Sequence, residues 1–465
     1  MAPQLLPGRP GNLTPDQEEK LRKLWLLVLQ LCGTADNNET PSTDASTSQE
    51  QDPNSGGKKQ RFSMFRKNRG DSKSGAADAP STADTIVKNG ASDDDKYGQT
   101  KQFQEMIANN TPETIRETLW SMVKHDHPDA LLLRFLRARK WDVEKALVMA
   151  VSTLNWRHNE MLVDADIMKN GEGGAQEDEK AEDARTQKLG KDFMAQIRMG
   201  KSFLHGTDKN GRPICVVRVR LHKQGEQCEE SLEKYTVYII ETTRMLLAPP
   251  VDTATIIFDM TGFSMANMDY TPVKFMIKCF EANYPESLGA VLVHNSPWIF
   301  QGIWRVIRGW LDPVVAGKVH FTNNKAELAE FIEPGQILKE LGGEEDWEYK
   351  YVEPVAGEND AMKDTAAKER LLEARADVVK NFEAATLDWI HQPGGDEGKS
   401  NKAKRDEIAA ELREGYWRLD PYLRARSLYD RIGVIQPGGK ITWDASRAPA
   451  PKAQPAPETS ADDLD

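Results

Sequence analysis

The sequence predicts an α/β fold with a helical N-terminal region, a mostly parallel sheet and a C-terminal helical extension. Two continuously apolar runs, at 254–259 and 288–293, and a shorter one at 318–321 have the length and composition of buried strands. Helical segments at 272–283 and 298–311 separate them, and this alternation is typical of parallel βαβ units. Apolar residues recur at helical spacing on both sides of this stretch.

The composition of the chain limits its function. The 465 residues allow up to about three domains, and 61 Lys and Arg against 73 Asp and Glu give a net charge of −12. A nucleic-acid-binding protein needs a broad basic face, so we expect no nucleic-acid partner. The four cysteines form no CxxC pair, and we expect no metal ion and no cofactor. Because no apolar run is long enough to span a membrane and no secretory signal is evident, we expect a cytoplasmic protein.

The N-terminal part combines one helix with a long polar segment. A capped start at Thr14 and apolar residues at helical spacing indicate that residues 1–33 form a helix that packs on the core. Residues 34–100 are rich in Ser, Thr, Asp, Asn and Gly, and we expect them to be disordered. The basic island within them, at 58–69, is either a solvated linker, which we favour, or a tether to anionic membranes.

The rest of the chain divides into five parts by composition and periodicity. Three capped or proline-started helices indicate a small bundle, an acidic Gly-rich stretch indicates a loop, and a Pro- and Ala-rich end indicates a disordered tail. In chain order, the expected parts are the helical domain at 111–161, the acidic loop at 164–190, the α/β lobe at 191–352, the C-terminal helical extension at 355–445 and the tail at 446–465.

Two patterns resemble phosphate-binding or catalytic motifs but fit them imperfectly. The GKS at 200–202 imitates the end of a phosphate-binding loop, yet Ala195 stands where that loop needs glycine. The GFSMA at 262–266 places Ser264 between a strand and a helix, as in a hydrolase, but its last residue is not glycine. We favour an ordinary loop and predict no catalytic residue, which leaves a serine lipid hydrolase as a minor alternative.

The segment WIFQGIWRVIRGWL, at 298–311, is the least typical element of the sequence. Apolar side chains cover well over half of its helical surface, and Gln301, Arg305 and Arg308 supply its polar face. It could be a core helix of the sheet. It could equally line an apolar cavity on one side and touch a membrane on the other, because Trp and Arg suit the headgroup region of a bilayer. The apolar residues concerned are Trp298, Ile299, Phe300, Ile303, Trp304 and Ile307.

Charged residues occur where apolar elements begin or end. Glu286 precedes the strand at 288–293, Lys318 opens the next strand, and Arg139 and Lys140 follow a short helix. Position alone favours ion pairing at the ends of elements. The alternative is a polar mouth above an apolar pocket, where Arg or Lys would bind a phosphodiester and a carboxylate would accept the hydroxyls of a polyol.

Five segments resemble, in order and spacing, the Sec14-like, CRAL-TRIO family of lipid-transfer proteins: LLRFLRARKWD, HGTDKNGRP, FDMTGFS, YPESLGAVLVHNSPWIF and DPVVAGKVHF. They lie within 111–351, and both ends of the chain are similar to the fungal Csr1-type branch of phosphatidylinositol transfer proteins. The resemblance implies a helical N-terminal tripod (CRAL-TRIO-N) and a lobe whose sheet floors a deep lipid pocket. It also implies a mobile gate helix, here Trp298 to about Gly309. By the same resemblance, the phosphatidylinositol headgroup would be bound by Arg139, Lys140, Glu286 and Lys318.

The resemblance also locates the pocket floor. Members that bind choline lipids have hydroxyl side chains where this chain has Ala254 and Ile256, on a strand that continues to Phe258. Tyrosines that surround choline correspond to Phe203 and Leu204 here. Because both changes remove hydrogen bonds and cation–π faces, the resemblance argues against phosphatidylcholine as a second ligand.

Together these observations predict a lipid carrier rather than an enzyme. The expected ligand is a phospholipid, with phosphatidylinositol favoured, and the expected encounter is with a transient membrane surface. The expected location is the cytoplasm with peripheral association to membranes. The alternative is a carrier or sensor of another hydrophobe, such as a sterol or squalene, that acts as a scaffold. No protein partner is indicated.

Overall fold

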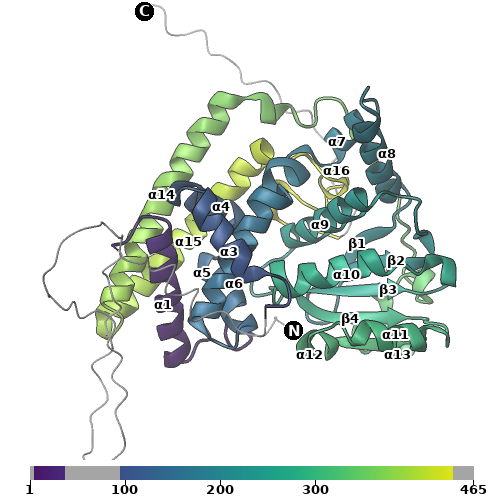
Figure 1. Cartoon of the computed structure of the whole chain (residues 1–465), viewed down its shortest axis with the longest axis horizontal. Coiled ribbons are helices and arrows are strands. Elements are labelled where there is room, and N and C mark those ends of the chain that lie inside the picture. The colour runs from purple at the N-terminus through teal and green to yellow at the C-terminus, as the bar shows by residue number, and fades with distance from the viewer. Residues whose placement is uncertain (1–4, 37–94, 444–465) are drawn as a thin grey trace, which may run out of the picture.

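The computed structural model describes residues 5–36 and 95–443 (Figure 1). The basic island at 58–69 and the tail at 446–465 lie outside the described residues. A helical half lies beside a half built on a sheet (Figure 1), which confirms the expected α/β fold with N-terminal and C-terminal helices. Among the helices of the described ranges, none combines the length and apolar character needed to cross a bilayer.

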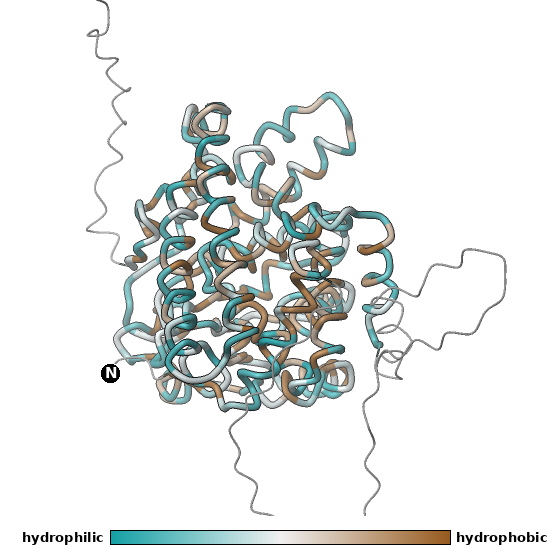
Figure 2. Tube along the Cα trace, turned by 90° about the vertical axis from the view of Figure 1, so that its left-hand side faces the viewer, coloured by the Kyte–Doolittle hydropathy of each residue, from teal (hydrophilic) through white to brown (hydrophobic). Residues whose placement is uncertain are grey.

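The N-terminal helices share one apolar core. They are α1 (Pro15–Leu31), α3 (Gln99–Asn109), α4 (Pro112–Val123), α5 (Pro128–Ala138) and α6 (Val143–Asn155). Helices α1, α4, α5 and α6 begin with a capping residue or a proline, as the sequence predicted, and Thr14 forms a capping box with Gln17. Helix α3 was not predicted, since Phe103 and Met106 are its buried apolar residues and its other positions are largely polar. In Figure 2, brown and teal alternate along the helices, as expected where one face is buried.

The acidic segment at 164–190, expected to be a loop, is helical instead. It contains a π-helical turn at Val163–Ile167, α7 (Met168–Asp178) and the start of α8 (Ala184–Arg198). Two of its carboxylates make internal contacts. Asp164 forms ion pairs with Lys124 at 3.0 Å and with Arg157 at 2.9 Å, and Glu172 is buried. The cations that pair with Asp164 come from other elements, so local composition could not reveal the helices.

The sheet positions the site. Its strands follow the order β1 (Ser202–Thr207), β2 (Pro213–Arg218), β3 (Ala254–Asp259), β4 (Leu288–His294) and β5 (Val319–Thr322). The β1–β2 pair is antiparallel and the other three pairs are parallel. Ile256 of β3 lies between Cys215 of β2 and Val291 of β4. Because β4 and β5 are parallel, residues that precede them meet at one edge of the sheet.

The two faces of the sheet are covered differently. On one face, Leu292 packs with Leu328, Ile332 and Leu341 from α13 (Lys325–Leu328) and the segment that follows it. The other face lies beneath three helices, and α12 (Pro313–Ala316) follows them in the chain. These three are α9 (Glu229–Met245), α10 (Tyr270–Lys278) and α11 (Phe300–Arg308).

The C-terminal extension joins the two halves. Helices α14 (Thr365–His391) and α15 (Gly395–Leu423) run side by side (Figure 1). They place Phe382, Trp389 and Leu412 in the core of the helical half. The short α16 (Leu428–Arg431) then packs Leu428 and Tyr429 on the cavity side of the sheet.

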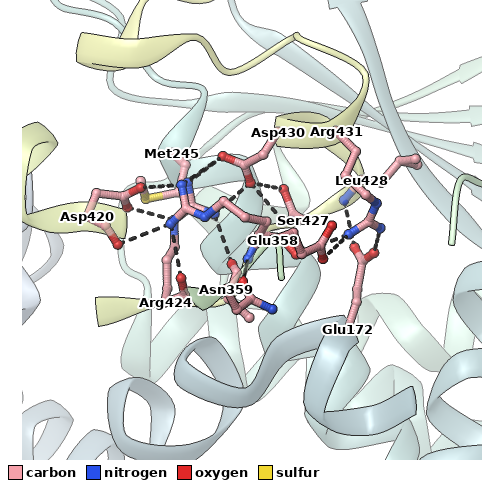
Figure 3. Close-up of polar contacts among 12 residues, drawn as sticks. Glu172, Met245, Glu358, Asn359, Asp420, Arg424, Ser427, Leu428, Asp430 and Arg431 are labelled. Carbon is pink, nitrogen blue, oxygen red and sulfur yellow. Dashed lines mark hydrogen bonds and ion pairs between the residues drawn. The ribbon is translucent and has the colours of Figure 1, made fainter. Parts of the chain in front are cut away.

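An ionic cluster, here called the C-terminal clasp, fastens this extension (Figure 3). Its members are Asp420, Arg424, Arg426, Ser427, Asp430 and Arg431. Arg424 pairs with Asp420 at 2.7 Å and with Asp430 at 2.8 Å, and all three are buried or nearly so. Arg431 reaches Glu172 of α7 and lies 3.0 Å from Glu358. The clasp therefore fixes the end of the extension to the sheet half.

Candidate functional site

An apolar cavity of about 230 Å³ lies between the sheet and helices α9, α10 and α11. Side chains from four parallel strands form its floor, and the three helices form its roof. The strand residues that line it include Val217, Ile256, Phe258, Val291, Val293 and Val319. Native cores normally contain few voids larger than a water molecule, so a space for on the order of fifteen waters indicates a ligand site.

Three of the four residues expected on the pocket floor lie on the cavity side of the sheet. Ile256 and Phe258 line the cavity, and Ala254 lines a neighbouring one of about 80 Å³ that shares Ile256. The prediction for Phe203 is wrong. Successive strand residues point to opposite faces of the sheet, so Phe203 lies on the face that α13 covers, opposite the cavity. The centre of its ring is 5.4 Å from that of Trp347.

Helix α11 forms the cavity wall expected from the Trp-rich segment, but it begins at Phe300 rather than Trp298. The cavity-lining side chains of α11 are Phe300, Trp304 and Ile307, and Ile303 is buried in the same apolar cluster. Trp298 and Ile299 precede the helix and are 86% and 40% exposed. The apolar residues therefore divide into a buried set and an exposed pair, so α11 is not simply a core helix.

A second, polar pocket of about 750 Å³ lies at the edge of the sheet where β4 and β5 begin. All four residues expected to bind a headgroup line it: Arg139 and Lys140 after α5, Glu286 before β4 and Lys318 before β5. Five apolar residues line both this pocket and the apolar cavity, namely Ile277, Phe280, Leu288, Leu311 and Val315. The two spaces are therefore neighbours that share a wall.

The central charges of the polar pocket are close but not tightly paired. The Lys318 Nζ lies 3.9 Å from the Glu286 Oε2, and each side chain keeps about a quarter of its surface exposed. Burial lowers the pKa of Lys318, although the Glu286 carboxylate opposes this. Glu286 and Lys140 have φ angles of 55° and 50°, a left-handed conformation that costs of order 1–3 kcal/mol without glycine. Such strain clusters at binding sites.

The folded chain adds charged residues to this pocket that no sequence pattern singled out. Glu281 accepts hydrogen bonds from the Tyr97 hydroxyl at 2.6 Å, from the Lys96 Nζ at 2.8 Å and from the Asp312 N–H at 2.6 Å. Lys274 also lines the pocket. Tyr97 and Lys96 belong to the segment expected to be disordered, so their sequence context gave no signal.

The candidate serine nucleophile has ordinary structural contacts. The Ser264 hydroxyl donates to the Asn267 Oδ1 at 3.0 Å, within a capping box that opens a short 3₁₀ turn. His294 is buried, with its ring nitrogens 3.0 Å from the Thr322 Oγ1 and 3.2 Å from the Leu341 carbonyl oxygen. The contacts of Ser264 and His294 are thus with other residues, and the two do not form a nucleophile–base pair.

Comparisons with known proteins match both the helical half and the sheet half of the molecule. The family model of the CRAL/TRIO domain matches residues 197–343, and that of the CRAL/TRIO N-terminal domain matches residues 99–152. A CRAL-TRIO domain-containing protein of Schizosaccharomyces pombe is 42% identical over 430 residues, which cover 92% of this chain and 93% of that protein. The phosphatidylinositol transfer protein CSR1 of Eremothecium gossypii is 39% identical over 444 residues, covering 92% and 98%. The Sec14 cytosolic factor of S. pombe is 29% identical and covers 46% and 74%.

The ranges matched by the two family models contain the four charged residues expected to bind a headgroup. Arg139 and Lys140 fall within the N-terminal domain model, and Glu286 and Lys318 fall within the CRAL/TRIO model. Two of the relatives align over nearly their whole length, so the likeness includes the C-terminal helices as well. The chain belongs to the Sec14-like, CRAL-TRIO family.

Proposed function

We propose that the protein is a carrier of phosphatidylinositol, with the headgroup in the polar pocket and the acyl chains in the apolar cavity. The observation that carries the proposal is the wall shared by the two spaces. A ligand with one polar end and long apolar tails matches two adjoining spaces of opposite character. The name of the E. gossypii relative, a phosphatidylinositol transfer protein, supports the same ligand.

The residues of the polar pocket suit an inositol phosphodiester. Arg139, Lys140 and Lys318 supply cations for the phosphate, and the Glu286 carboxylate can accept hydrogen bonds from inositol hydroxyls. On the floor strand, Ala254 and Ile256 offer choline no hydroxyl group, and Leu204, which lies on the cavity side, offers it no cation–π face. We therefore expect phosphatidylcholine to bind more weakly than phosphatidylinositol.

Selectivity has to come from the headgroup. Burial of the acyl chains contributes about 0.8 kcal/mol per CH₂, but the bilayer offers the chains the same burial. Exchange also requires that the cavity open, and α11 is the wall we assign to this movement, with Trp298 and Ile299 at its membrane-facing end. The protein thus acts as a carrier rather than an enzyme, in peripheral contact with membranes.

The test is transfer of phosphatidylinositol between vesicles by the full chain. Glu286→Ala and Lys318→Ala are each expected to lower the transfer rate about tenfold, because a charge-assisted hydrogen bond contributes about 1.5–3 kcal/mol. The matched control is Lys325→Ala, which removes a lysine paired with the exposed Glu344 on the outer side of the sheet. Unchanged transfer by both pocket variants would refute the site. Retention of lipid without transfer would instead indicate a sensor or scaffold.

A further inference from the structure

The apolar cavity has a polar far end that the proposed function does not use. Lys201, His222, Asp269 and Gln196 line it there. The Lys201 carbonyl oxygen accepts a hydrogen bond from the Arg218 N–H at 2.8 Å, which places Lys201 at the carboxyl end of β2. The headgroup pocket lies at the opposite edge, and the six residues of β3 separate the two edges by about 17 Å.

Lys201 is a buried cation surrounded by uncharged acceptors. The residue is 6% exposed. Its Nζ lies 2.7 Å from the Gln227 Oε1, 3.3 Å from the Gln196 Oε1 and 3.4 Å from the His222 Nδ1. No carboxylate in the described part of the chain is within ion-pair distance of this ammonium. Burial lowers the pKa of Lys201 to about 8, the direction expected for a lysine that lacks an anionic partner.

The one carboxylate on this wall of the cavity is held away from the ammonium. The Asp269 Oδ2 lies 3.3 Å from the His222 Nε2, and the same carboxylate accepts the Thr271 N–H at 3.0 Å at the start of α10. Since the His222 Nδ1 faces Lys201, the imidazole accepts on that side and donates to Asp269 on the other. The positive charge at this end of the cavity is therefore not neutralised by a direct ion pair.

A buried ammonium without a counter-charge is costly, and an anion that enters the same dry space would supply one. We propose that the far end of the cavity is a second ligand subsite that binds the carboxylate of a single-chain fatty acid, with Lys201 as its cationic anchor. The hydrocarbon chain would lie over Phe258 and Ile256 toward the opposite edge. A purely structural role explains the hydrogen bonds of Lys201 to the two glutamines, but it does not explain why the cation lines an apolar cavity. The subsite depends on the cavity and not on the identity of the headgroup.

Equilibrium binding of radiolabelled oleic acid and methyl oleate to the delipidated full chain tests this subsite. The two probes have the same hydrocarbon chain and differ in the charge of one end. The wild-type protein should bind oleate at least tenfold more tightly than the ester. Lys201→Met removes the charge with little change in shape, so it should abolish the preference by weakening oleate alone. Lys201→Gln is a second variant that should give the same result.

Lys318→Met is the control that separates this subsite from the headgroup pocket. It should keep the preference for oleate although we expect it to lose phosphatidylinositol transfer, so the two proposals fail independently. Equal binding of oleate and ester by the wild type, an unchanged preference in Lys201→Met, or a preference lost in Lys318→Met would each overturn the subsite. If the Lys201 variants do not fold, the wild type still decides: oleate, and not its ester, should slow reductive methylation of Lys201 while leaving Lys325 unaffected.

Discussion

Helix α11 and the C-terminal clasp both lie against the cavity side of the sheet, but opposite kinds of interaction hold them. The buried residues of α11, Phe300, Ile303 and Ile307, make apolar contacts. Arg305 and Arg308, on its outer face, form no ion pair with any residue that the structure describes. The clasp is instead a network of buried guanidinium and carboxylate groups (Figure 3).

The difference indicates which of the two coverings can move. Apolar contacts are non-directional, so α11 can leave the sheet and re-form its contacts, or replace them with lipid, at little geometric cost. A buried ionic network loses hydrogen bonds as soon as its members separate, and each unpaired charge is then costly. We therefore expect α11 to open and the clasp to stay closed during lipid exchange.

The largest effect should come from breaking the clasp at its contact with α7. Glu172 is 1% exposed and accepts hydrogen bonds from the Tyr238 hydroxyl at 2.7 Å, the Leu428 N–H at 3.0 Å and the Arg431 guanidinium. Glu172→Ala leaves Arg431 without this partner, so the free energy of unfolding should fall by about 3–5 kcal/mol. Urea denaturation followed by circular dichroism measures this loss.

The matched control is a partly exposed glutamate in an ion pair of similar length. Glu230 lies 2.8 Å from Arg185, whose side chain is largely exposed. Glu230→Ala should therefore change the free energy of unfolding by at most about 1 kcal/mol. Equal effects of the two substitutions on the free energy of unfolding would show that the buried network is no more stabilising than an exposed ion pair. The proposed difference between the clasp and α11 would then be wrong.

A smaller effect on stability is expected from pH, through a buried histidine that packs against α15. His125 is buried against the rings of Tyr416 and Trp417 in α15, at 5.9 Å and 5.0 Å between centroids. Burial lowers its pKa to about 4. The unfolded chain, with a histidine pKa of about 6.5, then binds more protons below that pH, so stability falls as the pH decreases from about 6.5 toward 4.

Between pH 7 and pH 5 this linkage amounts to about 2 kcal/mol for His125. Denaturation curves at the two pH values should show that His125→Phe, which cannot be protonated, removes about that much of the pH dependence. His158, which is exposed, is the control position for the same substitution. A pH dependence as large in His125→Phe as in the wild type would contradict the linkage.

The fold could be predicted where its signals are local. The apolar runs at 254–259 and 288–293 correspond to β3 and to β4, which extends one residue further, and the capped start of α1 at Thr14 was visible in a few residues. The helices within 164–190 could not be predicted. Their acidic residues are buried by distant partners, as Glu172 is by Arg431, 259 positions later in the chain.

The candidate site shows the same division. The four charged residues proposed to bind a headgroup could be singled out because they stand at the ends of elements in motifs that resemble a family, and the fold brings all four to the polar pocket. Phe203 was assigned to the wrong face, since the strand pattern at 202–204 does not show which of two adjacent apolar residues, Phe203 or Leu204, faces the cavity. Lys201 appeared in the sequence only as part of a failed phosphate-loop motif, and its place in the cavity depends on tertiary structure.

The smallest expected effect on folding concerns Trp298. The same substitution tests directly whether α11 or the C-terminal extension contacts the membrane. Its side chain is 86% exposed and contributes little to the folded state, so Trp298→Ala should change the free energy of unfolding by no more than about 0.5 kcal/mol. If the start of α11 inserts into a bilayer, loss of a large apolar side chain should weaken vesicle binding about tenfold, as about 1.5–3 kcal/mol of burial is lost. Co-sedimentation with phospholipid vesicles measures this change.

Leu372→Ala, at a residue that is 40% exposed on α14, is the control, because that helix belongs to the extension that the ionic clasp holds in place. Equal vesicle binding by both variants would mean that α11 opens without docking on the membrane through Trp298, whereas a loss confined to Trp298→Ala would identify the apolar covering as the one that meets lipid.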